Sequence, residues 1–191
     1  MHPTSAPLTD VDLSRINISR EISRSDASSI MHLKLFHGNG DPGYTEDGRD
    51  LNRFRCEFNA YKKLLASGVC GRGFVPKFYS YINRVNLAAS VFQHFAYDKL
   101  NPSAILLEFL LNAECLNCMN YSDALHSQVT EGMKQIHRAD VHHRDIYPRN
   151  MLLVRGNPDR LVWIDFDVAT TFTDFGPKQL AHSDHEISLV K

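Results

Sequence analysis

The sequence predicts an α+β fold in two lobes, of which the second is reduced in size. Three observations support this prediction. Short apolar segments typical of strands accompany one amphipathic helix in residues 13–109. A polar link then follows an apolar strand that ends near residue 110. Residues 110–180 contain a second amphipathic helix, a loop that carries adjacent histidines, and a hairpin pattern.

The first lobe follows a polar, proline-containing segment, residues 1–12, which we expect to be a flexible tail. Apolar residues alternate weakly at 16–22, which is compatible with a strand. The alternation is clearer at 28–36, a predicted strand that contains Lys34. Four glycines and a proline then predict a loop at 37–48.

A helix is predicted from Leu51, because apolar residues recur there at steps of three and four and form one stripe. Asp50 is the candidate N-cap of this helix, and Gly68 is the candidate stop signal. The apolar stripe comprises Leu51, Phe54, Phe58, Tyr61 and Leu65.

Three more strands complete the predicted first lobe. Two short strands at 74–82 and 87–95 are joined by a turn, and a buried strand at 104–110 leads into the link. The residues of this last strand are apolar apart from Glu108.

The second lobe begins with a helix that opens at Ser122 and ends near Ala139. Its predicted apolar stripe consists of Leu125, Val129, Met133 and Ile136. Short apolar strands at 151–154 and 161–164 predict a hairpin, since a Gly-Asn-Pro-Asp turn lies between them. The acidic, histidine-rich end of the chain, residues 181–191, is expected to be a solvated tail.

The composition excludes few function classes, but it indicates the expected partners and cellular compartment. The formal net charge is −1 over 191 residues, which gives no reason to expect nucleic acid or a membrane as partner. The N-terminus has neither the basic nor the apolar region of a secretory signal. Four cysteines lack the spacing of a zinc site, and reduced thiols are the simplest interpretation. We therefore expect an intracellular protein, cytoplasmic or nuclear.

Two motifs carry the predicted chemistry. Residues 143–150 read His-Arg-Asp-Ile-Tyr-Pro-Arg-Asn, which matches the pattern H-R-D-x-x-x-x-N at all four fixed positions. Twenty residues after Asp145, the sequence Ile-Asp-Phe-Asp follows a predicted strand and contains Asp165. Asp and Asn also occur as turn and cap residues, but the joint match in this order favours a functional site.

Residues 28–170 resemble the protein-kinase-like superfamily, and most closely the short kinase-like proteins common in filamentous fungi. The resemblance implies a bilobal fold that binds ATP and Mg²⁺. It implies that Lys34 contacts the α- and β-phosphates, that Glu57 pairs with this lysine, and that the 105–110 hinge segment, which includes Glu108, meets the adenine.

Phosphoryl transfer needs positioning and charge neutralisation more than covalent chemistry. By the same resemblance, Asn150 and Asp165 are the expected ligands of Mg²⁺, which prefers oxygen donors. Asp145 is expected to accept or orient the proton of an attacking hydroxyl. The phosphate acceptor is then a hydroxyl of a protein or of a small molecule. His143 is interpreted as a structural histidine of the loop.

The sequence departs from the kinase pattern at the phosphate cover and at the metal motif, among other places. No glycine occurs in residues 1–33, so the glycine-rich phosphate cover is missing or replaced, for instance by Arg20 or Arg24. Asp167 stands where the metal motif of kinases has glycine. The missing glycine-rich cover and the reduced second lobe leave a second hypothesis open, a pseudokinase that binds nucleotide or a partner without useful turnover. Lys34 and Glu57 each also fit the simpler role of a solvated surface charge.

Overall fold

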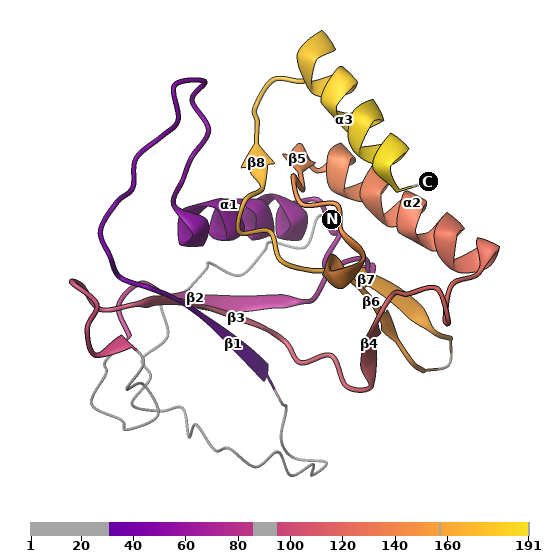
Figure 1. Ribbon diagram of the computed structural model, residues 1–191, viewed down its shortest axis with the longest axis horizontal. Helices are drawn as coiled ribbons and strands as arrows, with labels where there is room; N and C mark the ends of the chain where they lie inside the picture. The colour runs from indigo at the N-terminus through magenta and orange to yellow at the C-terminus, as the bar shows by residue number, and fades with distance from the viewer. Residues whose placement is uncertain (1–30, 86–94, 157, 191) are drawn as a thin grey trace, which may run out of the picture. The chain divides into compact units, whose positions relative to one another are not determined.

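The computed structural model describes residues 31–85, 95–156 and 158–190 (Figure 1). These residues form a mixed α/β structure with three α-helices and small antiparallel sheets. They divide into two compact units: the first takes the residues up to Pro42 and those between Phe78 and Phe109, and the second takes the rest. No helix in the described ranges is long and apolar enough to cross a membrane.

The first unit contains a three-stranded antiparallel sheet in the order β1-β3-β2. The strands are β1 (Met31–Phe36), β2 (Phe78–Ile82) and β3 (Ser103–Glu108). The central strand β3 is almost entirely buried, as its apolar run predicts. The predicted strands at 28–36, 74–82 and 104–110 are thus confirmed, although residues 74–77 and 109–110 are not in a strand and residues 28–30 lie outside the described part of the chain.

Several predictions fall on parts of the chain that the structure does not describe. They are the tail at 1–12, the strand at 16–22, and the strand at 87–95 except for its last residue. The proposed phosphate cover by Arg20 or Arg24 also lies outside the described residues.

Helix α1 (Arg53–Ala66) confirms the first predicted helix, but its N-cap is Asn52 rather than Asp50. The Asn52 side chain accepts a hydrogen bond from the backbone N–H of Arg55 at 3.0 Å. Asp50 lies two residues before this N-cap. Its carboxylate accepts a hydrogen bond from the Asn52 N–H at 2.9 Å and pairs with the Arg55 guanidinium. After the helix, Gly68 adopts φ +77°, the left-handed conformation of a helix stop.

The buried face of α1 differs from the predicted stripe. Of the five predicted apolar residues only Tyr61 is buried, and Leu51 is exposed. Phe54 and Phe58 are only partly buried, and their rings stack at 5.8 Å. Two overlapping sets of residues on this helix have helical spacing. Tertiary packing buries a set that differs from the predicted stripe. The buried set is Cys56, Glu57, Ala60, Tyr61 and Leu64.

Helix α2 (Asp123–Arg138) is the central helix of the second unit and confirms the second predicted helix. Ser122 caps it by accepting from the Leu125 N–H at 3.3 Å, and all four residues of the predicted stripe are buried. Gly132 allows Trp163 to pack closely, since a Cβ at this glycine would lie 3.0 Å from the indole. The Trp163 indole N–H donates to the Val129 carbonyl at 3.1 Å.

The predicted hairpin is confirmed as β6 (Met151–Val154) and β7 (Arg160–Trp163), which pair antiparallel. The short strand β4 (Ala113–Cys115) extends this sheet beside β6. A second small sheet pairs β5 (Val141–His142) with β8 (Thr170–Thr171). The β5–β8 sheet joins the two ends of the segment that carries both sequence motifs, and the β6–β7 hairpin lies between the motifs.

The C-terminal part of the chain corrects the prediction of a solvated tail. Residues Pro177–Leu189 form helix α3, which lies beside α2 (Figure 1). Gly176 precedes the helix and Pro177 occupies its first turn, a combination that favours a helix start. Ser183 and Glu186 are buried on its inner face. The tail prediction failed because the buried face of α3 is polar and therefore carries no apolar stripe.

Candidate active site

The H-R-D-x-x-x-x-N segment forms a loop that joins β5 to a 3₁₀ turn at Pro148–Asn150. The Asn150 side-chain amide donates to the Asp145 carboxylate at 2.8 Å and to the Asp145 backbone carbonyl at 2.9 Å. Arg149 donates to the same carboxylate at 2.9 Å. The loop therefore places the two predicted polar residues at its ends in direct contact.

Asp145 is held in its ionised form. Burial acts to raise the pKa of this carboxyl, but hydrogen bonds from Arg149 and Asn150 and the charge of Arg149 lower it below its ordinary value overall. The side chain is only 18% exposed. An oriented carboxylate that is charged at neutral pH can accept a proton or fix the direction of a hydroxyl.

His143 lies behind the loop and is fully buried. Its Nε2 donates to the Ile164 carbonyl at 2.9 Å, and its Nδ1 accepts from the Asp145 N–H at 3.3 Å. The imidazole ring packs 4.7 Å from the ring of Phe166. Burial lowers the pKa of His143, so the ring is neutral at pH 7. These contacts are those of a structural histidine that links both motifs.

The second motif lies next to the loop. The Ile164 N–H donates to the Asn150 carbonyl at 3.0 Å. Asp165 is therefore the residue that directly follows a hydrogen-bonded neighbour of the loop. Asp165 has φ +67°, a conformation that is uncommon for residues other than glycine and clusters at functional sites. Its negative charge contributes, with that of Asp145, to raising the pKa of Arg149. The backbone directly before Asp165 is thus joined to Asn150, whose side chain contacts Asp145.

Asp167, the residue that replaces glycine, forms an ion pair with Arg53 at the start of α1, at 2.5 Å. The Asp167 side chain is 14% exposed, whereas that of Arg53 is 65% exposed. This hydrogen bond and the charge of Asp167 raise the pKa of Arg53, and Asp165 adds a smaller contribution. The additional negative charge of the motif is therefore balanced by a cation from a distant part of the sequence.

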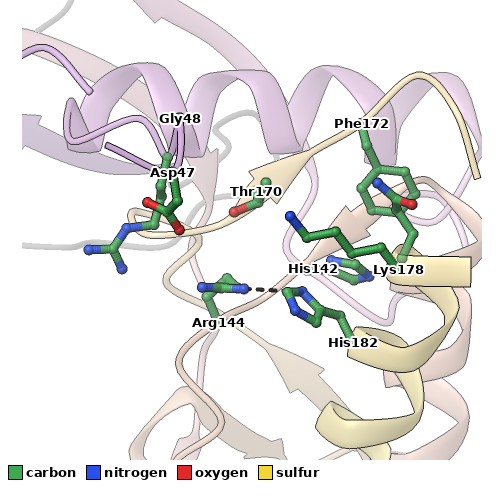
Figure 2. Close-up of a pocket in the computed structure, with 10 residues that line it drawn as sticks. Asp47, Gly48, His142, Arg144, Thr170, Phe172, Lys178 and His182 are labelled. Carbon is green, nitrogen blue, oxygen red and sulfur yellow. Dashed lines mark hydrogen bonds between the residues drawn. The ribbon is translucent and has the colours of Figure 1, made fainter. Parts of the chain in front are cut away.

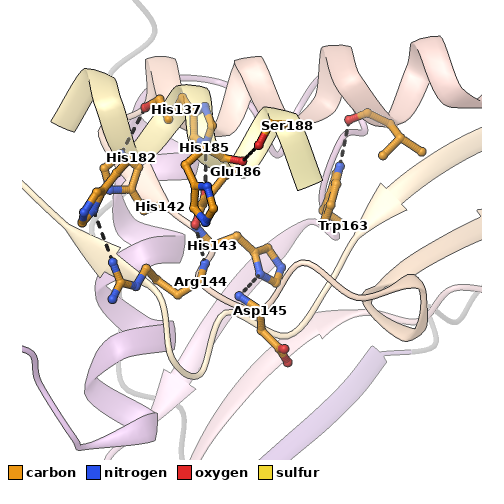
Figure 3. A network of polar contacts seen from close by, with 12 residues as sticks. His137, His142, His143, Arg144, Asp145, Trp163, His182, His185, Glu186 and Ser188 are labelled. Atoms are coloured by element: carbon orange, nitrogen blue, oxygen red, sulfur yellow. Dashed lines mark hydrogen bonds and ion pairs between the residues drawn. The ribbon is translucent and has the colours of Figure 1, made fainter. Parts of the chain in front are cut away.

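Sequence reasoning missed Glu186, a buried residue of α3 (Figure 3). Its carboxylate accepts from the backbone N–H groups of His143 at 3.1 Å and Arg144 at 2.7 Å, and it contacts His137 Nε2 at 2.8 Å. Arg144 has φ +70°, so Glu186 fixes a strained part of the loop directly before Asp145. The Gly-Pro start of α3 is the signal in the sequence that could have revealed this helix.

The other predicted site residues lie elsewhere. Lys34 and Glu108 belong to strands of the first unit, where Lys34 lies opposite Ile105 and its ammonium is 5.2 Å from the ring centre of Phe36. Glu57 belongs to the second unit and is fully buried in α1, so it is not the exposed charge of the simpler interpretation. The pairing of Lys34 with Glu57 stays a prediction.

Asn150 and Asp165 are the residues of the two motifs that could hold a metal ion. The Asn150 amide nitrogen is directed to Asp145, so an ion would be bound through the oxygen of the same side chain. No cluster of three or more His, Cys, Asp and Glu side chains suited to a metal occurs in the described parts of the chain. A pair of ligands suits Mg²⁺, which usually takes its remaining ligands from water and substrate phosphates.

Two comparisons with known proteins show similarity to kinases. The sequence model of the Lipopolysaccharide kinase (Kdo/WaaP) family matches residues 85–182, which is 98 of the 191 residues. A Dictyostelium discoideum protein with the name "Putative cyclin-dependent serine/threonine-protein kinase" is 25% identical over an alignment of 113 residues that covers 55% of this chain. The aligned part spans 16% of the length of that curated relative.

Proposed function

This chain belongs to the lipopolysaccharide kinase (Kdo/WaaP) family, and we propose that it is an ATP-dependent phosphotransferase that transfers the γ-phosphate to a hydroxyl of a protein or small molecule. One observation supports the proposal: the Asn150 amide donates to the Asp145 carboxylate, and the Asn150 carbonyl accepts from the N–H of Ile164, the residue before Asp165. Such an arrangement supplies the positioning and charge that phosphoryl transfer requires.

In this proposal the hydroxyl that accepts the phosphate binds beside the Asp145 carboxylate. Its carboxylate is fixed from two sides by Arg149 and Asn150, so a hydroxyl would meet an oriented oxygen. A lowered pKa makes Asp145 a weak base, which suits orientation of the hydroxyl and late acceptance of its proton.

Asn150 and Asp165 would hold Mg²⁺ through one amide oxygen and one carboxylate. When bound, Mg²⁺ neutralises phosphate charge and orients the terminal phosphate of ATP. The buried Asn150 amide is rigidly held by its two hydrogen bonds to Asp145. The ion pair with Arg53 makes Asp167 a poor candidate for a further ligand, because its charge is already balanced.

The nucleotide side of the site is part of the same proposal. We assign Lys34 to the phosphates, Glu57 to the support of Lys34, and the segment around Glu108 to the adenine. A bilobal kinase-like arrangement would bring these groups to Asp165. The placement of Lys34 on a strand and the burial of Glu57 on α1 support these assignments.

The proposal extends to an intracellular location, cytoplasmic or nuclear. All four cysteines are free thiols in the structure, as is usual in a reducing compartment. The likeness to short fungal kinase-like proteins belongs to the proposal as well and rests on the two motifs.

The test is a pair of measurements on the purified full chain. Thermal unfolding should shift upward with Mg²⁺ and ATP, because a ligand selective for the folded state stabilises it by mass action. ATP turnover should then appear with a panel of proteins and small alcohols. A shift without turnover would identify the pseudokinase alternative, whereas the absence of any shift at millimolar ATP, in protein shown to be folded, would contradict the nucleotide site itself.

A further inference from the structure

Two of the cavities among the described residues of the second unit differ in chemical character. Figure 2 shows the smaller one, of about 140 Å³, whose wall includes the charged side chains of Asp47, Arg144 and Lys178. The larger one, of about 530 Å³, is lined by eleven described residues, and none of these is Asp, Glu, Lys or Arg. We call this larger one the apolar cavity.

The apolar cavity is built by four segments that are distant in the sequence. They are the turn after β4, the first half of α2, residues 146–151, and the end of α3. Seven of the eleven lining residues are Leu, Val, Ile, Met or Pro, so the wall is mainly apolar. Leu116, Val129 and Met151 are buried, whereas Leu189 is 53% exposed. The cavity therefore runs from the core of the unit to its surface, and a ligand can enter it from solvent.

The polar lining residues include some that are already hydrogen-bonded and some that are open. The Asn117 side-chain carbonyl accepts from the Met119 N–H at 2.8 Å, and its amide donates to the Cys115 carbonyl at 3.0 Å. His126 and Tyr121 have ring centres 6.2 Å apart, and among the described residues neither has a hydrogen-bond partner. A neutral imidazole has one donor and one acceptor nitrogen, and a phenol hydroxyl can act as either. A ligand can therefore form a hydrogen bond with either of these two residues.

The volume and the wall together define the class of ligand. Sites for small molecules measure about 300–1,000 Å³ and are mainly apolar with a few polar groups, and this cavity has both properties. A charged ligand group would lose its hydration here without gaining a fixed opposite charge from the described wall, which is costly. An extended peptide would bring backbone N–H and C=O groups that all need partners. An uncharged, mainly apolar small molecule with one hydroxyl or carbonyl group meets these conditions.

We propose that the apolar cavity is a binding site for such an uncharged, mainly apolar small molecule. The site does not depend on the proposed phosphotransferase activity, because none of the residues assigned to that activity lines it. Ile146 and Pro148 do line it, and they belong to the loop at 143–150. A bound molecule would therefore pack against this loop, at positions other than the two backbone N–H groups that Glu186 binds.

The first measurement uses the full chain and N-phenyl-1-naphthylamine, an uncharged apolar fluorophore whose emission rises in apolar surroundings. We expect this probe to bind the folded chain and 1-octanol to displace it. Octanoate has the same chain length but is charged at pH 8. It should displace the probe at least about tenfold more weakly, because the described wall offers no fixed positive charge. Absence of probe binding, or equal displacement by the two competitors, overturns the proposal.

Two variants of α3 test the location of the site. Leu189→Glu places a charge in the cavity wall, whereas Leu180→Glu places the same charge on the same helix away from it. The two leucines are 53% and 50% exposed, so both variants should fold. We expect Leu189→Glu to lose at least about tenfold in affinity for 1-octanol, and Leu180→Glu to bind as the unmodified chain does. Equal affinity in all three chains overturns the proposal. So does a dimer of the unmodified chain that Leu189→Glu dissociates in sedimentation, because the cavity would then hold a second copy.

The cysteines give a measurement that needs no variant. Cys118 lines the cavity and Cys115 does not, and both are exposed free thiols, whereas Cys56 and Cys70 are buried. Saturating 1-octanol should slow the alkylation of Cys118 by iodoacetamide several-fold, because an occupied cavity excludes the reagent, and should leave that of Cys115 unchanged. Tandem mass spectrometry distinguishes the two sites. An unchanged rate at Cys118, or equal slowing at both cysteines, overturns the proposal.

Discussion

Two carboxylates support the candidate site in different ways. Glu186 is 7% exposed and contacts three hydrogen-bond donors, two of them backbone N–H groups of the loop at 143–150 and the third His137, which is 6% exposed. Asp167 lies at the end of the Ile-Asp-Phe-Asp motif and pairs with Arg53, whose side chain is 65% exposed. Both are acid–base pairs between distant parts of the sequence. The difference in burial indicates that the contacts of Glu186 determine whether the loop is formed. The Asp167–Arg53 pair instead adjusts the charge near Asp165.

Replacement of Glu186 by alanine tests the first half of this comparison and should have the largest effect. It leaves two buried backbone N–H groups and His137 without their acceptor, and loss of one partner from a buried pair costs about 3–5 kcal/mol. Urea unfolding of the variant should show a loss in this range. Asp184→Ala, which removes an exposed carboxylate from the same helix, is the control and should change little. Equal effects of the two substitutions would show that Glu186 is not a structural support.

The loop and the metal motif should also differ in what they contribute to function. Asp145→Asn should leave Mg²⁺-dependent ATP binding nearly intact and lower turnover by about 10²–10⁴-fold, the usual contribution of a general base. Asp165→Asn should weaken ATP binding, since it removes carboxylate charge from the proposed metal site. Binding is measured by thermal shift and turnover by product formation. The roles are reversed if Asp145→Asn abolishes binding and Asp165→Asn does not.

Acidification should lower the free energy of unfolding in two steps, one from His143 and one from Glu186. Burial depresses the pKa of His143 below its ordinary 6.5, so its contribution to stability is present above pH 6.5 and is lost as pH falls through the lower folded-state pKa. For Glu186, burial acts to raise the pKa, but hydrogen bonds from His137 and the backbone lower it overall below 4.5. Its contribution is therefore present above pH 4.5 and is lost below that value.

The free energy of unfolding, measured by urea titration between pH 7.5 and 3.5, should decrease throughout this series. In Glu186→Gln the lower step should become smaller while the upper step remains, because Asp145, whose pKa is also lowered, still contributes to the lower step. A free energy that stays constant between pH 7.5 and 5.5 would contradict the assignment of His143 as a buried neutral histidine.

Disruption of the exposed Arg53–Asp167 ion pair should have the smallest effect on the free energy of unfolding. Arg53→Ala should reduce the free energy of unfolding by no more than about 1 kcal/mol, because exposed ion pairs contribute little. A double-mutant cycle with Asp167→Asn measures the coupling, and Arg138→Ala, which breaks a second exposed ion pair, that with Glu131 at 3.5 Å, gives a comparison at equal 65% arginine exposure. A coupling as large as the loss in Glu186→Ala would remove the distinction between the two regions.

The sequence alone determined the features that depend on local spacing. The apolar stripe and Ser122 cap of α2, the hairpin of β6 and β7, and the four fixed positions of the catalytic-loop motif are all properties of neighbouring residues. Local propensity, turn residues and side-chain periodicity act over a few residues, so they can be recognised in a single chain. The structural role of His143 was predicted for the same reason.

Only the tertiary structure decided which of several locally acceptable faces became buried. On α1 it selected the face with Cys56 and Glu57 rather than the predicted phenylalanines. It turned an apparently solvated tail into α3, because the backbone N–H groups of His143 and Arg144 need a buried acceptor and Glu186 supplies one. It likewise paired Asp167 with Arg53, which is 114 residues away. Contacts at such separations leave no periodic signal in the sequence, since they are fixed by the packing of whole elements.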